Sequence, residues 1–210
     1  MFNEEFTAAS KGAAAKSALL KKNPGGYFLL SMLAGAYIGF GILLVFTLSG
    51  ALAGAPYTKL VMGCCFGIAL SLVVIAGAEL FTGNNLVMTA GLLRKTVTLG
   101  DALKLWGVCW VGNLAGSALL ALVFSLTGLY SDATLSAMTG AAAAKMTAGF
   151  IPLLTRGMLC NTLVCLAVWC GFRAKSDAGK LLMIFWCLLA FFATGFEHGV
   201  HEAGTFSLIA

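Results

Sequence analysis

Residues 61–93 read VMGCCFGIALSLVVIAGAELFTGNNLVMTAGLL, and this stretch decides the architecture of the chain. It is apolar along its whole length apart from one charge, that of Glu79. A helix needs about 20 apolar residues to cross a bilayer, so the stretch is too long for one straight crossing. The Gly- and Asn-rich run from Glu79 to Asn85 in its middle favours a loop. We therefore predict a membrane-spanning helix that is broken near Glu79.

The rest of the chain has the same apolar character. Hydrophobic residues make up 60% of its 210 residues and charged residues 10%, which argues against a soluble domain, a disordered chain or a nucleic-acid binder. Four further apolar segments occupy residues 27–55, 105–131, 146–172 and 181–210. The sequence thus predicts an all-α membrane protein with five spans in its channel domain, residues 27–210. Residues 1–26 are expected to form a helical surface arm that ends near Asn23-Pro24-Gly25-Gly26.

The distribution of Lys and Arg between the loops predicts the orientation. Placing the spans in order leaves only Lys59 and Lys145 on one side of the membrane. The other side receives Lys11, Lys16, Lys21, Lys22, Arg94, Lys95, Lys104, Arg173, Lys175 and Lys180. Cytoplasmic loops carry the excess of positive charge, so the N-terminus and its arm are expected to be cytoplasmic.

A weak internal repeat relates two points of the chain. Gly77-Ala78-Glu79 and Gly195-Phe196-Glu197 share a G-x-E core at the same place in the second and fifth spans. Two halves of three spans, about 27–131 and from about 146 onward, would enter the membrane in opposite directions. A third span of the second half is then expected after Ala210, beyond the end of this sequence. Paired broken helices in inverted halves point to a transport site.

Several motifs resemble signatures of the formate/nitrite transporter family. They are AELFTGN at 78–84, CNTLVCLAVW at 160–169 and GFEH at 195–198, supported by AGAYIG at 34–39 and GNLAG at 112–116. The resemblance covers about residues 20–200 and is greatest to the nitrite channels. It implies an aquaporin-like bundle of inverted three-helix repeats with broken second and fifth helices. It also implies a homopentamer in a bacterial-type inner membrane, with one pore per protomer for nitrite, formate, hydrosulfide or similar anions. No cofactor or metal is expected.

The same resemblance assigns roles to individual residues. A pore histidine, His198, would lie near Thr82 and Asn161, with Lys145 in an outer vestibule. Narrow apolar constrictions on either side would be formed by Phe66, Leu70, Leu80, Phe81 and Phe191.

The chemistry of these residues suits a pore for weak-acid anions. An imidazole exchanges protons near neutrality, so His198 could bind an anion or convert it to the neutral acid. Thr82 and Asn161 donate hydrogen bonds without a permanent charge, which permits release. A vestibule lysine such as Lys145 concentrates anions. Carboxylates would repel them, so Glu79 and Glu197 are predicted to be structural and to accept N–H groups of the broken backbone.

Other interpretations of the same residues stay open. His198 could be a buried structural histidine, Thr82 a helix cap and Asn161 an interhelical hydrogen-bonding group. The chain could also be a neutral-solute channel of the aquaporin, urea or ammonium type, although paired Asn-Pro-Ala motifs are absent from the sequence. A membrane metalloenzyme would use the cluster Glu197, His198, His201 and Glu202. A non-transporting subunit is the remaining alternative. The seven cysteines are interpreted as packing residues rather than as ligands of zinc or an iron–sulfur cluster.

Overall fold

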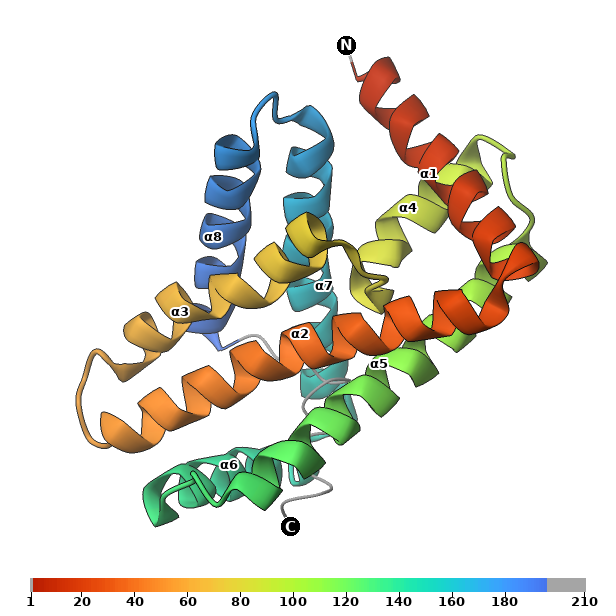
Figure 1. The fold of residues 1–210 in the computed structure, drawn as a ribbon. Coiled ribbons are helices and arrows are strands. Elements are labelled where there is room, and N and C mark those ends of the chain that lie inside the picture. Colours follow the sequence, from red (N-terminus) through yellow and green to blue (C-terminus); the bar gives the residue numbers. More distant parts are fainter. Residues whose placement is uncertain (1, 196–210) are drawn as a thin grey trace.

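The computed structural model describes residues 2–195, and over that range it contains helices and no strand (Figure 1). The helices are α1 Asn3–Lys22, α2 Pro24–Ala51, α3 Thr58–Leu72, the π-helical turn η1 Val73–Gly77, α4 Phe81–Leu93, α5 Leu99–Thr127, α6 Asp132–Met146, α7 Phe150–Arg173 and α8 Asp177–Thr194. Five of these segments are long and apolar enough to cross a membrane: α2, α3 with η1, α5, α7 and α8. They correspond to the five predicted spans. Helix α4 is the second half of the broken span.

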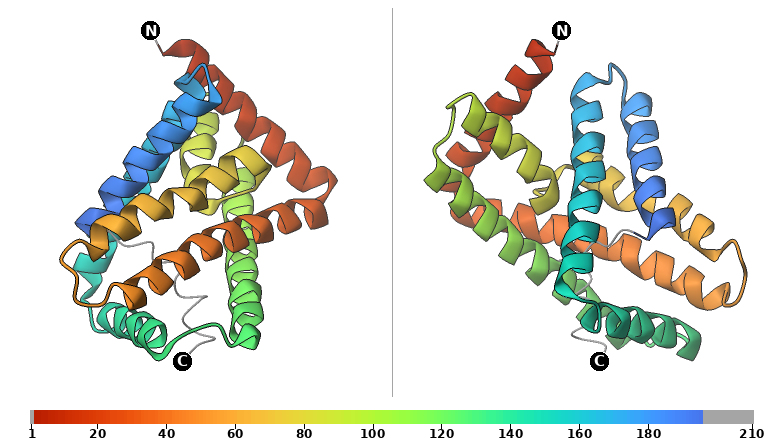
Figure 2. Two further views of the ribbon diagram at one scale, coloured as in Figure 1. Left: turned by 60° about the vertical axis from the view of Figure 1, so that its left-hand side comes forward. Right: turned by 180° about the vertical axis from the view of Figure 1, so that it is seen from behind.

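Helices α2 and α5 lie side by side (Figures 1 and 2), and at two glycines of their contact there is no room for a side chain. A Cβ atom at Gly35 would overlap the backbone of Asn113, and one at Gly116 would overlap the backbone of Met32. Helices in lipid gain little from burying apolar surface against one another, and small residues let their backbones approach instead. The motifs AGAYIG and GNLAG therefore specify this helix pair.

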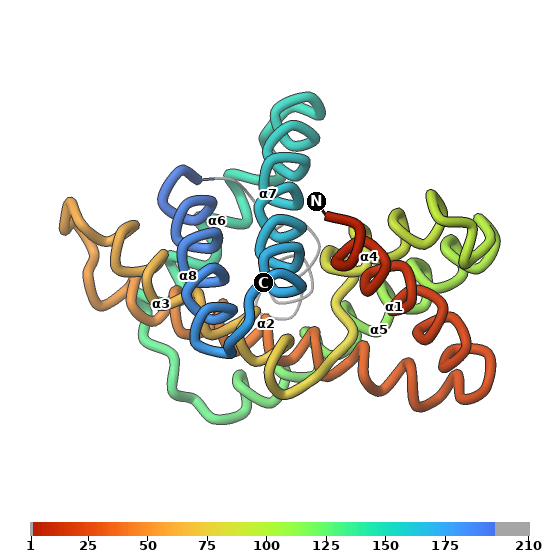
Figure 3. Tube along the Cα trace, turned by 90° about the horizontal axis from the view of Figure 1, so that it is seen from above, coloured from red at the N-terminus to blue at the C-terminus, as the bar shows by residue number. Residues whose placement is uncertain are grey.

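The two spans that carry the G-x-E motifs lie against each other. Helix α3 packs on α8, with Gly63 facing Leu189 and Gly67 facing Phe185. Helices α7 and α8 form a hairpin beside α3, which is clearest from above (Figure 3). The interior of this part of the molecule is one apolar cluster built from α2, α3, η1, α6, α7 and α8, together with Leu80 of the segment before α4.

The N-terminal arm is a helix, as predicted, and it is docked on the channel domain. Ala9, Ala13 and Leu20 of α1 are buried, and α1 lies mainly against α4. Two arginines hold its first turn, since the Arg173 guanidinium lies 4.6 Å from the centre of the Phe2 ring and that of Arg94 lies 5.3 Å from the centre of the Phe6 ring. The arm ends at Asn23 as predicted, and the Asn23 side chain caps α2 by accepting a hydrogen bond from the Gly26 N–H at 2.9 Å.

One element differs from the sequence prediction. The sequence predicts no helix between the third and fourth spans, whereas residues Asp132–Met146 form helix α6. The Ser131 hydroxyl caps it by accepting from the Thr134 N–H at 3.2 Å, and its alanine run favours helix. Met138 anchors α6 in the apolar cluster. Helix α6 and the α2–α3 turn lie at the end of the molecule opposite to the start of α1 and the α7–α8 turn (Figure 2).

Candidate functional site

The second span is broken between Gly77 and Phe81, where the sequence predicted a break. Gly77 has a φ of +82°, a left-handed conformation that glycine adopts without strain, and Ala78 and Leu80 are extended. Backbone groups exposed at membrane depth need partners. The Glu79 N–H donates to the Leu30 carbonyl oxygen at 3.2 Å and the Phe81 N–H to Asn113 Oδ1 at 2.8 Å. The break is therefore held by the two neighbouring spans.

The Asn113 side chain makes the hydrogen bonds that hold this break in place. Its side chain is fully buried, and besides accepting from Phe81 its Nδ2 donates to the carbonyl oxygens of Ser31 at 2.7 Å and Glu79 at 2.8 Å. The three hydrogen bonds tie α2, the break and α5 together. Asn113 belongs to the GNLAG motif, and the sequence analysis predicts no role for it. Its role could have been suspected because it is the one side-chain amide in the uncharged run 105–131.

Glu79 lies at the break, and its hydrogen-bond partners differ from those expected. Its carboxylate was expected to accept N–H groups of the broken backbone. It instead accepts from Lys16 Nζ at 2.5 and 2.6 Å, from the Tyr27 hydroxyl at 3.1 Å and from Asn84 Nδ2 at 3.0 Å. The Glu79 and Phe81 N–H groups of the break are already taken by Leu30 and Asn113. The carboxylate thus lies in a buried side-chain network, paired with a lysine of α1 that sequence reasoning treated only as arm charge.

In the structure Thr82 and Asn161 lie at the same helix–helix contact, that between α4 and α7. Asn85, one turn after Thr82, donates from Nδ2 to Asn161 Oδ1 at 3.4 Å. Cys165, one turn after Asn161, lies with its Sγ 3.7 Å from the Thr82 carbonyl oxygen. The Thr82 hydroxyl is buried and has no hydrogen-bond partner within residues 2–195. A buried hydroxyl without a partner is costly, and such a group is a candidate for contact with a ligand.

Four of the five predicted constriction residues share one cluster. Phe66, Leu70, Leu80 and Phe191 are each at most 3% exposed and lie together in the apolar cluster. The rings of Phe66 and Phe191 meet edge to face with centres 5.7 Å apart. Phe81 does not join them, and it packs against a second cluster that contains Val87, Met88 and Leu105. Leu80 is the extended residue before α4 and Phe81 its first residue, so the two side chains enter different clusters.

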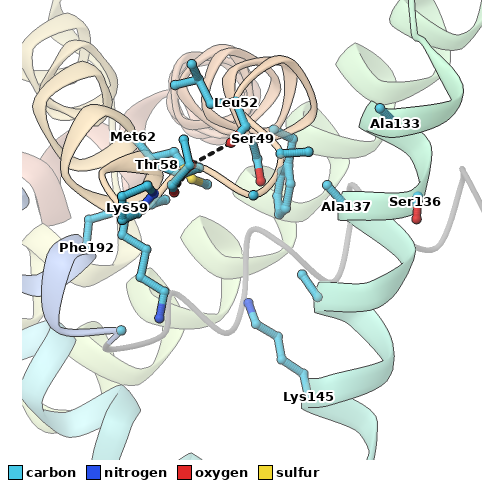
Figure 4. Close-up of a pocket in the computed structure, with 17 residues that line it drawn as sticks. Ser49, Leu52, Thr58, Lys59, Met62, Ala133, Ser136, Ala137, Lys145 and Phe192 are labelled. Carbon is cyan, nitrogen blue, oxygen red and sulfur yellow. Dashed lines mark hydrogen bonds between the residues drawn. The ribbon is translucent and has the colours of Figure 1, made fainter.

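Two cavities adjoin this apolar cluster at opposite ends of α3. The larger cavity, about 800 Å³, is lined at the start of α3 by Lys59 and Met62, and also by Lys145 and Phe192 (Figure 4). The smaller cavity, about 500 Å³, is lined at the other end of the helix by Leu70 and Val73, and also by Lys16, Glu79 and Leu80. From Met62 to Leu70 the helix rises by about 12 Å, with Phe66 midway. The cluster therefore separates two cavities that each contain a lysine.

The predicted pore histidine cannot be placed. His198 and Glu197 lie outside the described residues, as do His201 and Glu202 of the alternative metal cluster. The described part of the fifth span ends at Thr194, followed by Gly195 with a φ of +79°. Gly195 itself lines the larger cavity. Lys145, assigned to a vestibule, lines the same cavity from the last turn of α6.

Comparison with known proteins gives a consistent set of similarities. A sequence profile of the family described as "Formate/nitrite transporter" matches residues 3–210. The nitrite transporter NirC of Salmonella typhimurium is 43% identical over 209 residues, which cover 99% of this chain and 77% of that protein. A solved "FNT family ion channel" is similar with a TM-score of 0.93 at 41% identity, over 100% of this chain and 83% of that one. A "Pentameric formate channel with formate bound" gives 0.76 at 28% identity, over 95% and 75%.

Proposed function

Because this chain belongs to the formate/nitrite transporter family, we propose that it forms a transmembrane channel for small monovalent anions, with nitrite as the main substrate and formate as a further one. One observation carries the proposal. An apolar cluster of Phe66, Leu70, Leu80 and Phe191 separates two cavities along a single helix. Narrow apolar constrictions exclude hydrated cations.

The proposed route uses the neutral donors at the centre. An anion that enters the cluster loses water and needs hydrogen bonds that are weak enough to break again. The buried Thr82 hydroxyl, which has no hydrogen-bond partner within residues 2–195, and the Asn161 amide lie on facing helices and can supply them. His198 remains the proposed group that lends or accepts a proton, by its resemblance to the family's pore histidine. Hydrosulfide is the third substrate in this proposal.

The inverted-repeat architecture is also proposed, and two features support it. Gly77 and Gly195 have nearly equal left-handed φ angles, +82° and +79°, at the ends of α3–η1 and α8. The four buried residues of α8 each match a buried residue of α3 or η1 at the spacing that separates these glycines. The matching pairs are Phe66 with Ile184, Ala69 with Cys187, Leu70 with Leu188, and Val73 with Phe191. We place residues 27–131 in the first repeat and residues from 146 onward in the second.

Orientation and assembly are proposed on the same basis. Arg94 and Lys95 follow α4, and Arg173 and Lys175 lie at the α7–α8 turn, all at the end of the molecule where α1 begins. That concentration of positive charge supports a cytoplasmic N-terminus in the inner membrane of a bacterium. A similar solved channel is pentameric, which supports a homopentamer here.

The proposal is tested by anion currents in proteoliposomes that contain the purified protein. We expect currents with nitrite and formate that exceed those with chloride, and that change between about pH 5 and 7.5 because weak-acid anions exchange protons. In His198→Ala we expect the pH dependence to disappear. Equal passage of uncharged solutes such as urea, with no anion current, would favour the neutral-solute alternative. The named relatives are transporters and channels and not enzymes.

Thr82→Val tests the central donor. Valine has the same shape as threonine and lacks the hydroxyl, which has no partner within residues 2–195, so the fold should tolerate the change. We expect nitrite currents to fall about tenfold while the thermal midpoint stays within a few degrees, since one hydrogen bond to a charged ligand contributes about 1.5–3 kcal/mol. Thr155→Val, at an exposed hydroxyl on α7, is the control. An unchanged current in Thr82→Val would remove Thr82 from the route.

A further inference from the structure

We propose that Asn85 is a positioning residue for the anion route: it holds the Asn161 amide with its oxygen toward α4, which leaves the NH2 group of Asn161 to bind the anion. This inference rests on the proposed function and deepens it, because no role for Asn85 is expected from the sequence. Asn85 lies in the second turn of α4 and Asn161 in the middle of α7. Asn85 Nδ2 donates to Asn161 Oδ1 at 3.4 Å.

Two contacts fix how α4 and α7 face each other. Cys165 lies with its Sγ 3.7 Å from the Thr82 carbonyl oxygen, and Asn85 donates to Asn161. Asn85 follows Thr82 by three residues, whereas Asn161 precedes Cys165 by four. The two helices therefore run past each other in opposite directions, with their contacts about one turn apart. Thr82 and Asn161 thus lie diagonally across the same helix–helix contact.

The Asn161 amide and the Thr82 hydroxyl both have donor capacity to spare. The bond from Asn85 is the one side-chain hydrogen bond of Asn161 within residues 2–195, so its Nδ2 has no partner in that range. The Thr82 hydroxyl has none there either, and Thr82 is only 8% exposed. An anion between the two side chains would accept a hydrogen bond from each helix.

The two ends of an asparagine amide have opposite effects on an anion. The NH2 group donates hydrogen bonds, whereas the oxygen only accepts them and repels negative charge. An amide without a partner could turn either end toward the route. A donor that holds the oxygen removes the unfavourable orientation before the anion arrives, which lowers the ordering cost of binding. The bond from Asn85 has this effect on Asn161.

The preceding asparagine has a different set of partners. Asn84 Nδ2 donates to the Tyr27 hydroxyl at 3.1 Å and to the Glu79 carboxylate at 3.0 Å. Successive side chains of a helix point about 100° apart, so Asn85 is turned away from this buried network and toward α7. Asn84 is 2% exposed, whereas Asn85 is half-buried. Asn84 thus belongs to the helix break and Asn85 to the α4–α7 contact.

The α4–α7 contact adjoins the smaller cavity. Leu80 and Gly83, which flank Thr82 at the start of α4, line that cavity, and so does Val168 of α7. A Cβ atom at Gly83 would lie 3.5 Å from the Val168 side chain, so the two helices are in van der Waals contact here. Leu80 is also part of the proposed constriction. The amide that Asn85 orients is therefore close to the proposed route.

The test compares Asn85→Leu with the wild type in nitrite current measurements on proteoliposomes. Leucine has nearly the shape of asparagine and donates no hydrogen bond, so the Asn161 amide is no longer held. We expect the half-saturating nitrite concentration to rise about two- to tenfold, the cost of ordering one side chain on binding. The maximal current and the thermal midpoint should change little. Asn85→Gln keeps an amide donor and should restore part of the affinity.

A double-mutant cycle shows whether Asn85 acts through Asn161. The Asn161→Leu background has no amide to orient, so Asn85→Leu should add no further rise in the half-saturating concentration. Thr89→Leu, at an exposed residue one turn further along α4, is the matched control and should behave as the wild type. If Asn85→Leu does not assemble, Asn85→Ala removes the same donor with less bulk and is judged by the same criteria.

Each outcome decides one of the two proposals. A half-saturating concentration in Asn85→Leu equal to that of the wild type would overturn the positioning role and leave the channel intact. An equal rise in both backgrounds would also overturn it, because Asn85 would then act independently of Asn161. The same holds if Asn161→Leu behaves as the wild type or if Thr89→Leu has the effect of Asn85→Leu. Absence of any nitrite or formate current in the wild-type protein would instead contradict the proposed function.

Discussion

Lys16→Met is expected to reduce nitrite current at least tenfold and to destabilise the protein by about 2 kcal/mol. The Glu79 carboxylate is 11% exposed, and Lys16 supplies its only cationic partner among residues 2–195, at 2.5 Å. Removing the lysine leaves a negative charge in the smaller cavity, beside Leu80 of the constriction. That charge repels the substrate anion, and its poor hydration disfavours the folded state. Lys16 is a quarter exposed, so the loss should be below the 3–5 kcal/mol of a fully buried pair.

A double-mutant cycle separates charge from packing. Glu79→Gln in the Lys16→Met background removes the uncompensated charge, and we expect it to recover part of the current and of the thermal midpoint. Lys11→Met, at an exposed lysine of the same helix, is the matched control and should behave as the wild type. If the double variant is worse than Lys16→Met alone, the ion pair is not what matters at this position. Nitrite current and thermal unfolding in detergent are measured on the wild type, Lys16→Met, Glu79→Gln, the double variant and Lys11→Met.

Gly116→Ala is expected to destabilise the protein by about 3 kcal/mol or more. A single methyl group at this position would overlap the carbonyl oxygen of Met32, which is backbone and cannot rotate away. Helices α2 and α5 would have to separate, and with them the Asn113 hydrogen bonds to Ser31 and Glu79 that hold the break. The effect opposes the intrinsic preference of a helix for alanine over glycine, about 1 kcal/mol. The expected result is a much lower thermal midpoint and poor yield.

Gly107→Ala on the same helix is the control for this prediction. A Cβ atom at Gly107 meets nothing within 4 Å, so only the helix preference remains and stability should stay equal or rise. Thermal unfolding followed by intrinsic tryptophan fluorescence compares the two variants directly. Equal midpoints for Gly116→Ala and Gly107→Ala would show that the α2–α5 contact tolerates a wider separation than the structure indicates.

The spans and the broken helix could be predicted from the amino-acid sequence alone. Span length and the scarcity of charge follow directly from the bilayer thickness, so the five apolar segments could be predicted with small shifts at their ends. The break was predictable because Gly77 and Glu79 are local signals. The end of the arm was predictable because the Asn23 side chain caps the next helix and Pro24 has no backbone N–H to donate, and both act on residues next to them. These features depend only on neighbouring residues.

The ion-pair, hydrogen-bond and packing partners of the buried side chains follow only from the tertiary structure. Lys16 and Glu79 are 63 residues apart, and a salt bridge between them could not be inferred from either neighbourhood. The role of Asn113, the assignment of Phe81 to the second cluster and the contact of Asn85 with Asn161 likewise depend on helices that meet in space. In an apolar chain, hydropathy shows which segments cross the membrane but not which face of each helix packs against its neighbours. That packing face is set by the contacts of glycines and buried polar groups with other helices, which hydropathy does not encode.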